Sequence, residues 1–324
     1  MWRTRLLVTV LFVSVTELGV VVCLLLTRLF GTQRRHSLLY IYGVVVAALM
    51  VLMIYGLTTG DSTIVTRRLL VAEKNVPRAF DDYRIAVVSD LHVGTHFGDT
   101  AHLSAMVAAV NATKPDLICI VGDVVNFSEK EIEAVRPIFS RLVASDGVIS
   151  VMGNHDYLGY GLYPDSTERL SHIARLQAIE REMGWDLLLN EKRIIRRGAD
   201  SIVIVGTEND GEPPMPQLAN LARAMEGTER GALRILLTHD PTFWRRAVVG
   251  KTDIPLTFAG HTHGFQFGLP GGFSPAQWCY NEWGGLYREG QQRLYVTTGL
   301  GDNLIPWRLG MPAEVLVCSL RHVE

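Results

Sequence analysis

The sequence predicts an α/β domain of two packed, mixed β-sheets flanked by helices, preceded by a transmembrane helical hairpin. The whole chain has a mean hydropathy of +0.18, and the apolar excess is concentrated in residues 1–60. In residues 61–324, short β-branched runs alternate with helical patterns at first and dominate later, which fits two sheets covered by helices. That length is enough for one domain with a sizeable core.

The N-terminal segment contains two apolar runs, at about 6–27 and 37–60, and each is long enough to span a bilayer as a helix. The first run is interrupted by Glu17, and the second has no charged residue but has tyrosines near its ends, where interfacial aromatics are favoured. A cleaved signal peptide is the rival interpretation, but no A-x-A cleavage site follows. We therefore expect a membrane anchor over 1–60, with the lipid bilayer as its partner.

The charges around the two spans predict their orientation. The link between them carries three arginines, whereas Arg3 and Arg5 precede the first span and four basic residues follow the second by residue 78. The positive-inside rule therefore favours both termini, and the catalytic domain, on the cytoplasmic side. Glu17 is costly in mid-span unless it is neutral or paired. A neutral Glu17 bonded to Thr16 or the facing helix is favoured over a functional contact with a headgroup or partner helix.

The expected strands of the domain are short apolar runs bounded by turn residues. They lie at 64–72, 84–89, 116–121, 148–152, 187–195, 201–206, 234–238, 255–259, 293–298 and 313–320. The first is expected at a sheet edge, and residues 196–200 form the turn between the fifth and sixth.

The expected helices follow from spacing and capping residues. They lie at about 100–112, 128–144, 167–183 and 216–226. Ser128 is the expected N-cap of the second, with Glu131 three residues on as in a capping box. The proline at 115 follows the end of the first.

Composition excludes some classes of function. The formal net charge is −2, so nothing indicates nucleic-acid binding by bulk electrostatics. The four cysteines have no C-x-x-C spacing, which excludes a cysteine zinc cage and indicates no disulfide framework.

Polar clusters directly follow five of the apolar runs. They are Asp90-Leu91-His92, Gly122-Asp123, Gly153-Asn154-His155-Asp156, His239-Asp240 and Gly260-His261-Thr262-His263-Gly264. In open α/β sheets, ligands bind just beyond the carboxyl ends of strands. Carboxylates mixed with imidazoles suit Mn²⁺, Fe or Zn²⁺. The sequence therefore predicts a metal site at one edge of the sheets.

In this order, D-x-H, G-D-x-x-[DN], G-N-H-[DE], a lone His and G-H-x-H resemble the motifs of the calcineurin-like metallophosphoesterases, over roughly residues 62–324. The resemblance implies a four-layer αββα fold for 61–324 and two divalent ions, with Mn²⁺ favoured and Fe or Zn²⁺ as alternatives. It implies that a metal-bridging hydroxide attacks phosphorus. By the same resemblance, one metal is held by Asp90, His92, Asp123 and His263, and the other by Asp123, Asn154, His239 and His261.

The resemblance also gives His155 a role. This residue follows a metal ligand in the motif without being one, and in the family the matching His stabilises the transition state or protonates the leaving group. A His can act as an acid near neutral pH because its pKa lies close by. His96, four residues past His92, is expected to be a solvated loop residue.

Details of the motifs narrow the branch of the family. Asp156 and the absence of Arg-Gly after the second motif argue against a protein Ser/Thr phosphatase, and His155 stands where soluble UDP-diacylglucosamine hydrolases carry Arg. The chain is more similar to membrane-anchored bacterial phosphoesterases that read S-D-L-H, G-N-H-D-Y and G-H-T-H-G-G-Q. Some of these are UDP-2,3-diacylglucosamine pyrophosphatases of lipid A synthesis, and others act on phospholipids or model diesters. This resemblance implies the bacterial inner membrane and a lipid-linked substrate.

Three features of the sequence qualify that substrate. Phe265 replaces the second glycine of the last motif, and its ring would narrow or reshape the pocket. The segment 278–283, with Trp307, is rich in aromatics and forms either a membrane-facing wall or part of the core. Arg308 has no assigned role. The alternatives that remain are a phosphoesterase acting on glycerophospholipid or another small phosphoester, and a non-catalytic membrane scaffold.

Overall fold

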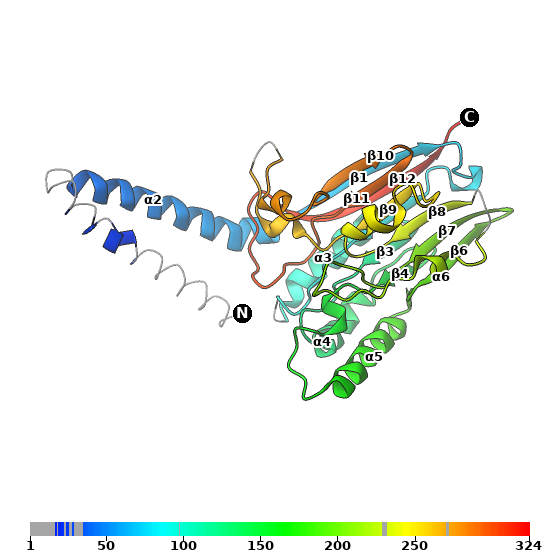
Figure 1. The fold of residues 1–324 in the computed structure, drawn as a ribbon, viewed down its shortest axis with the longest axis horizontal. Helices are drawn as coiled ribbons and strands as arrows, with labels where there is room; N and C mark the ends of the chain where they lie inside the picture. The colour runs from blue at the N-terminus through cyan, green and yellow to red at the C-terminus, as the bar shows by residue number, and fades with distance from the viewer. Residues whose placement is uncertain are drawn as a thin grey trace.

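The computed structural model describes residues 17, 19–22, 24, 25, 28, 35–96, 98–228, 232–269 and 272–324. Most of the first expected span, and most of the link that follows it, therefore lie outside the described residues. The second span is helix α2 (Arg35–Tyr55), which continues as a π-helix, η2 (Gly56–Gly60). It projects away from the domain (Figure 1).

Among the described residues, one helix, His36–Gly60, is long and apolar enough to cross a membrane. The hairpin as a whole therefore stays a prediction. One contact is consistent with it: an ideal Cβ on Gly19 would lie 2.4 Å from the ring of Tyr42 on α2. The absence of a side chain at residue 19 thus allows a close approach to α2.

The domain contains two six-stranded mixed sheets. The first runs in the order β1 (Ile64–Glu73), β12 (Ala313–His322), β2 (Arg84–Val88), β3 (Leu117–Val121), β4 (Val148–Val151) and β5 (Trp185–Leu187). Strands β2 to β5 are parallel, and β12 pairs antiparallel with β2 and parallel with β1. As expected, β1 lies at an edge.

The second sheet runs in the order β10 (Gly285–Glu289), β11 (Gln292–Val296), β9 (Leu256–Ala259), β8 (Leu233–Leu237), β7 (Asp200–Gly206) and β6 (Glu191–Arg197). Strands β11, β9, β8 and β7 are parallel, and the two outer strands are antiparallel to their neighbours.

Three apolar clusters hold four layers together. The central one packs inward-facing residues of the two sheets, such as Val87 and Cys119, against residues such as Ile204 and Phe258. A second cluster joins the outer face of the first sheet to α3 (Thr100–Ala112), α4 (Glu129–Phe139) and α5 (Ser166–Glu182), which cover that face (Figure 1). The third joins the other sheet to α6 (Leu221–Met225) and η5 (Trp244–Val248). The predicted two packed sheets flanked by helices are confirmed.

Several elements differ from the sequence prediction. The expected strand 187–195 is two strands, because β5 ends at Leu187 in one sheet and β6 begins at Glu191 in the other. Strand β5 is largely buried, whereas most residues of β6 are half-buried or exposed. The expected helix 216–226 is only Leu221–Met225, where the Asn220 side chain caps the helix by accepting from the Arg223 N–H.

Helix α4 is capped by Ser128 as expected, but it ends at Phe139 rather than near residue 144. The Glu131 side chain does more than the glutamate of a usual capping box, because it bonds backbone groups that precede the N-cap residue. Its carboxylate accepts hydrogen bonds from the backbone N–H groups of Asn126 (2.6 Å) and Phe127 (3.0 Å). The side chain therefore fastens the loop that follows Asp123 to the start of α4.

Candidate dinuclear metal centre

All the predicted ligands lie at the carboxyl ends of parallel strands. Strands β2, β3 and β4 of the first sheet and β8 and β9 of the second each stop at one of the five polar motifs, and the sheets bring these ends together. Parallel pairing makes this convergence unavoidable, because every strand of a parallel set ends at the same edge.

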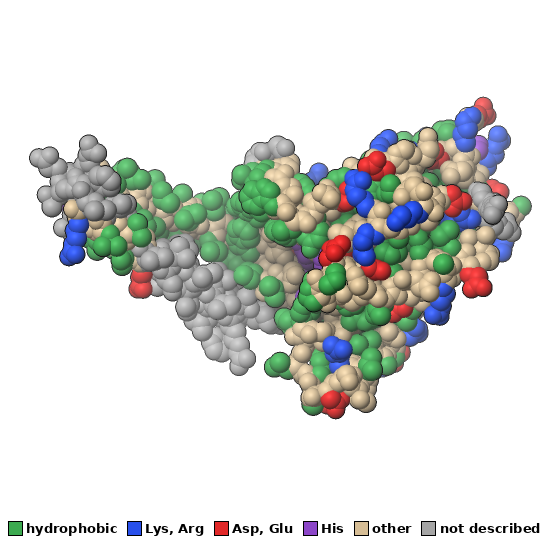
Figure 2. Space-filling model, in the orientation of Figure 1, with side chains coloured by type: hydrophobic (Ala, Val, Ile, Leu, Met, Phe, Trp, Pro, Cys, Tyr) green, Lys and Arg blue, Asp and Glu red, His purple; other side chains and the backbone are tan. Residues whose placement is uncertain are grey.

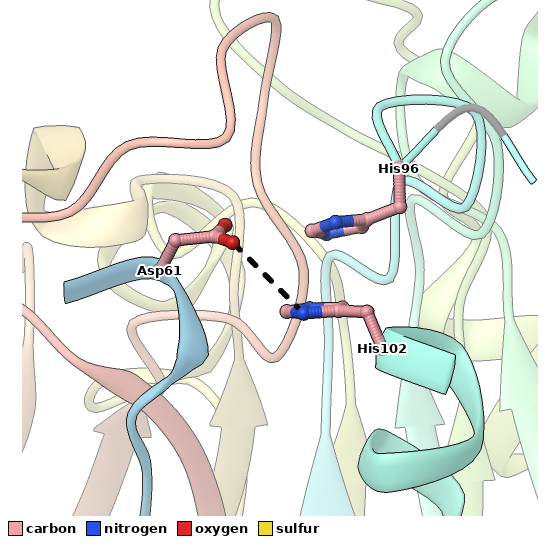
Figure 3. A group of neighbouring side chains, drawn as sticks. All are labelled: Asp61, His96 and His102. Atoms are coloured by element: carbon pink, nitrogen blue, oxygen red, sulfur yellow. Dashed lines mark ion pairs between the residues drawn. The ribbon is translucent and has the colours of Figure 1, made fainter. Parts of the chain in front are cut away.

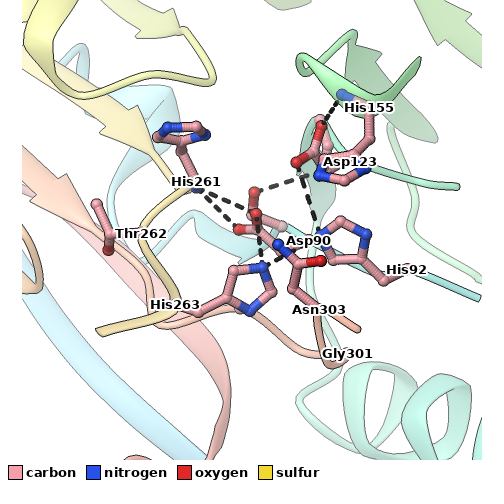
Figure 4. Close-up of polar contacts among 12 residues, drawn as sticks. Asp90, His92, Asp123, His155, His261, Thr262, His263, Gly301 and Asn303 are labelled. Atoms are coloured by element: carbon pink, nitrogen blue, oxygen red, sulfur yellow. Dashed lines mark hydrogen bonds and ion pairs between the residues drawn. The ribbon is translucent and has the colours of Figure 1, made fainter. Parts of the chain in front are cut away.

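One group of donors consists of Asp90, His92 and His263. His263 Nε2 lies 3.3 Å from Asp90 Oδ1 and 3.1 Å from His92 Nε2. All three residues are buried, and their rings and carboxylate point toward one another (Figure 4). Two imidazole nitrogens that face each other across a carboxylate suit a shared cation.

A second group consists of Asp123, His239 and His261, with Asn154 beside it. His239 Nε2 lies 3.1 Å from Asp123 Oδ2, and His261 Nδ1 lies 2.8 Å from Asn154 Oδ1. His239 Nδ1 donates to the Val121 carbonyl at 2.7 Å, so Nε2 is the nitrogen that faces the site.

Asp123 stands between the two groups. Its Oδ2 lies 3.1 Å from His239 and also 3.6 Å from His92 Nε2, which belongs to the other group. The structure therefore brings together all seven residues predicted as ligands, with Asp123 in the position of a bridge. Their ligand roles stay predictions.

The electrostatics of these groups suit a cation. Burial alone would raise the pKa of Asp123, but the imidazoles of His239 and His155 lower it well below its usual value. Burial alone would likewise lower the pKa of His239, but the Asp123 carboxylate raises it to about 10. Without an ion, a proton on His239 thus balances the buried carboxylate. A divalent ion would displace it, because a metal ligates the neutral imidazole.

One imidazole of the first group, that of His92, is already in the neutral form that binds a metal. Burial lowers the pKa of His92 to about 3, and the Asp123 charge only partly opposes this. Two buried carboxylates, Asp90 and Asp123, converge with four imidazoles and an amide oxygen. Such a donor set fits the two divalent ions that the sequence resemblance implies.

The backbone at the site is held in an unusual conformation. Asp90, Asp123 and His263 have φ of 54°, 54° and 51°, in the left-handed region that residues with a Cβ rarely adopt. His92 and His261 lie there too, at 39° and 74°. Strain of this kind concentrates at functional sites, where the surrounding structure enforces it.

His155 and Asp156 follow Asn154 in a short 3₁₀ turn and differ in role. Four backbone N–H groups donate to the Asp156 carboxylate, from Asp123, Val124, Val125 and Gly153. Asp156 therefore joins the β3 and β4 loops, and its carboxylate is occupied by their backbone N–H groups. Sequence reasoning gave it no such role.

His155 lies beside the donors (Figure 4). Its ring meets that of His92 edge to face, with ring centroids 4.8 Å apart, and its Nδ1 donates to the Asn126 carbonyl at 2.9 Å. Its other nitrogen, Nε2, is consequently the one available for chemistry.

A cavity of about 890 Å³ opens onto these residues. Its wall includes Asp123, Asn154, His155, His261 and His263, together with many apolar side chains. The apolar or aromatic members are Met53, Phe127, Tyr160, Met215, Phe265, Tyr280, Leu304, Ile305 and Trp307. Met53 belongs to α2, so the membrane-span candidate supplies part of the wall.

Several of these residues were not predicted from sequence. The Tyr160 ring lies 4.4 Å from that of His155, centroid to centroid, and its hydroxyl accepts from Asn154 Nδ2. Tyr280 Oη lies 3.1 Å from His261 Nε2, and Asp240 Oδ2 lies 3.6 Å from the same nitrogen. Only the position of Asp240, directly after His239, was a signal that sequence could have supplied.

The three features left open by sequence can now be placed. Phe265 is 45% exposed and lies at the cavity wall, so it shapes the pocket as expected. Trp278 is 74% exposed, so the aromatic segment is not simply core. Arg308 is buried, pairs with Asp302 at 2.6 Å and donates to backbone carbonyls, so it organises the closing segment.

The sequence profile of the family described as calcineurin-like phosphoesterase matches residues 83–265, which is more than half of the chain. The chain is 28% identical over 260 residues to the uncharacterized metallophosphoesterase YkuE of Bacillus subtilis, covering 77% of this chain and 82% of that protein.

It is also similar to two proteins named transmembrane protein with metallophosphoesterase domain. Identity is 28% to that of Bos taurus and 26% to that of Danio rerio, over 82% and 84% of this chain. The chain spans only 59% and 61% of the length of these two proteins.

The close approach of two loops at the site yields a prediction. An ideal Cβ on Gly153 would lie 2.2 Å from Asp123 Oδ1 and 2.6 Å from its backbone nitrogen. We expect Gly153→Ala to push the β3 and β4 loops apart, to lower the free energy of unfolding by about 1–3 kcal/mol, and to reduce bound metal. Denaturant unfolding and metal analysis by mass spectrometry measure both.

Gly159→Ala is the matched control, because no heavy atom lies within 4 Å of a Cβ at that position. It should leave metal content unchanged. Wild-type metal content and stability in Gly153→Ala would contradict the tight packing on which the site depends.

Proposed function

Because this chain belongs to the calcineurin-like phosphoesterase family, and is therefore a metal-dependent phosphoester hydrolase, we propose that it cleaves a phosphodiester or pyrophosphate bond in a lipid-linked substrate at the membrane surface. A compound such as UDP-2,3-diacylglucosamine fits this description. The observation that carries the lipid part is that Met53 of α2 lines the same cavity as the metal donors.

The metal chemistry follows from the donor set. Asp90, His92, Asp123 and His263 would hold one ion, and Asp123, Asn154, His239 and His261 the other; Mn²⁺ is proposed, with Fe or Zn²⁺ as alternatives. Two such ions, when bound, polarise a phosphoryl group and lower the pKa of water. The protein's own part is to hold the donors rigidly, through the Asp156 carboxylate and the His239 hydrogen bond to Val121.

His155 is proposed to stabilise the transition state or protonate the leaving oxygen. The Asn126 carbonyl accepts from Nδ1 and fixes the ring, which leaves Nε2 to carry the proton that is transferred. The Tyr160 ring packs against the imidazole and restricts its rotation. Glu131 holds the backbone at Asn126, so the carbonyl that orients His155 is itself fixed.

The cavity supports an acyl-bearing substrate. Met53 is seven residues before the end of the candidate span at Gly60, which corresponds to roughly 10 Å of helix at about 1.5 Å per residue. The acyl chains of a lipid that leaves the bilayer beside the domain end of α2 would therefore meet the apolar wall formed by Met53, Phe265 and Leu304. Figure 2 shows hydrophobic side chains clustered where α2 meets the domain.

A glycerophospholipid is the second candidate substrate. The same apolar wall would accept its acyl chains, and the exposed Phe265 ring reshapes the pocket relative to the related bacterial enzymes. A non-catalytic scaffold is disfavoured, since all seven ligand candidates and His155 converge with buried, matched donors.

The proposed location is the bacterial inner membrane, with the domain in the cytoplasm. The single apolar helix of the described residues and the two transmembrane relatives support membrane attachment. The arginines in the link and flanks support the orientation.

Replacing His155 tests the proposed proton transfer. We expect His155→Ala to keep its metal content and to lose about 10²–10⁴-fold in kcat on an aryl phosphodiester, because positioned acid–base groups contribute about that much. His172→Ala is the control, since this half-buried residue pairs with Glu129 on the helical side. Full turnover in a metal-replete His155→Ala enzyme would remove His155 from the mechanism.

Matched leucines test recognition of acyl chains. Leu304 at the cavity and Leu170 on α5 are each 61% exposed. We expect Leu304→Asn to lower kcat/KM for UDP-2,3-diacylglucosamine, followed by UMP release with Mn²⁺, roughly tenfold more than for an aryl phosphodiester. Leu170→Asn should affect neither. No UMP release, together with a lipid-selective effect on a glycerophospholipid, would favour the second substrate, and no selectivity at all would discard lipid recognition.

Cysteine labelling tests the orientation. Cys279 is exposed, whereas Cys119 and Cys318 are buried. In a Cys23→Ser background, a membrane-impermeant maleimide should label Cys279 in lysed bacterial cells but not in intact spheroplasts. Labelling in intact spheroplasts would place the domain outside the cytoplasm.

A further inference from the structure

A second group of metal-binding side chains lies outside the dinuclear centre, where the membrane helix joins the domain. Asp61 directly follows η2, His96 lies in the loop between β2 and α3, and His102 is in the first turn of α3. One ligand atom from each lies within 4.8 Å of the others. The three side chains point toward one another (Figure 3).

The imidazoles of His96 and His102 stack on each other, and each faces a carboxylate. Their rings are stacked, with centroids 3.8 Å apart and planes 16° from parallel. His102 Nδ1 lies 3.9 Å from Asp61 Oδ2, and His96 Nε2 lies 3.5 Å from Asp302 Oδ2. Both nitrogens therefore face carboxylates without the short contacts of ordinary hydrogen bonds.

Two buried polar atoms in this cluster lack hydrogen-bond partners among the described residues. His96 is 5% exposed, not a solvated loop residue as the sequence indicated, and its Nε2 has no hydrogen-bond partner among the described residues. Asp61 Oδ1 is likewise buried and unpartnered within the described part of the chain. A buried polar atom without a partner is costly, so two such atoms in one cluster of possible metal ligands indicate a missing ligand.

The charges indicate what that ligand is. Asp61 and Asp302 are two carboxylates served by one guanidinium, that of Arg308. The guanidinium pairs with Asp302 at 2.6 Å, whereas the ion pair found for Asp61 among the described residues is the 3.9 Å approach of His102.

We propose that Asp61, His96 and His102 bind a third divalent cation, of the zinc type, with Asp302 as an adjacent oxygen donor. Two neutral imidazoles and a carboxylate are a common zinc donor set. The three donor atoms lie within 4.8 Å of one another, whereas in a tetrahedral site with bonds of about 2.0–2.1 Å they lie roughly 3.3 Å apart. A bound ion would therefore draw them inward and turn the stacked rings so that both nitrogens point at it. The cation supplies the missing positive charge and satisfies both unpartnered atoms.

The third cation would join the anchor to the catalytic loop. Asp61 ends the membrane-span candidate, and the loop that carries His96 also carries His92, whose carbonyl accepts from Thr95 N–H at 2.9 Å. The Arg308 N–H donates to the Gly56 carbonyl at 3.2 Å, so the same junction already has one protein contact. The site is thus structural, and it does not depend on the proposed substrate.

Metal counting tests the third site. Full-length protein in detergent is loaded with Zn²⁺, passed over a resin that removes loosely bound ions, and analysed by mass spectrometry for zinc per chain. We expect the wild type to retain about one zinc more than His102→Gln or Asp61→Asn, because each change removes one of three ligands. His172→Gln is the control, because His172 pairs with Glu129 and belongs to neither metal group.

Circular dichroism and the melting temperature establish that the variants are folded, and the nearly isosteric Asp61→Asn serves if His102→Gln is not. In the wild type, added zinc should raise the melting temperature by more than in either variant. Equal zinc content in folded wild type, His102→Gln and Asp61→Asn would overturn the proposal and leave Asp61 and Asp302 sharing a proton. Neither result depends on phosphoesterase turnover, so the outcome is separable from that of the His155 experiment.

Discussion

The contact on which the site depends is that between Asp123 and His239. Asp123 follows β3 of one sheet and His239 follows β8 of the other, and their side chains meet at 3.1 Å in a fully buried position. Each group sets the ionisation of the other, because the carboxylate raises the pKa of the imidazole and the imidazole lowers that of the carboxylate. Two sheets that pack through apolar side chains are thus held at one edge by charge. Such a buried pair is costly unless further bonds complete it.

The completing bonds come from backbone and from side chains that do not face the pocket. Asp156 accepts four N–H groups across the two loops, and the Val121 carbonyl accepts from His239. These bonds help to hold the left-handed backbone at Asp123, a conformation that residues with a Cβ rarely adopt. The rigidity of the donors therefore originates in the packing of loops, and cations entering the site would meet a geometry that is already formed.

The sequence predicted those parts of the fold and the site that are determined by residues adjacent in the chain. A β-branched run followed at once by Gly-Asn-His-Asp predicts both a strand and a polar strand end, and parallel pairing then brings the ends together. It was insufficient where distant elements decide. The run 187–195 divides between two sheets because the chain crosses at Leu188 to Asn190. The sequence changes there from leucines to the polar stretch 190–193, but this change does not by itself show that the chain enters another sheet. His96 looked solvated because the residues beside it in the fold, Asp61, His102 and Asp302, come from other parts of the chain.

The junction between α2 and the domain ties this helix to the site. An ideal Cβ on Gly56 would lie 2.1 Å from Trp307 Nε1, and one on Gly60 would lie 1.9 Å from the Arg308 carbonyl oxygen, so both positions need glycine for α2 to reach the closing segment. That segment also carries Leu304 and Ile305 of the cavity wall. A shift of the helix end would therefore move Met53 and Trp307 together with it. The shape of the pocket is in this way tied to the position of α2, and a membrane that holds the helix would also hold the wall against which a substrate binds.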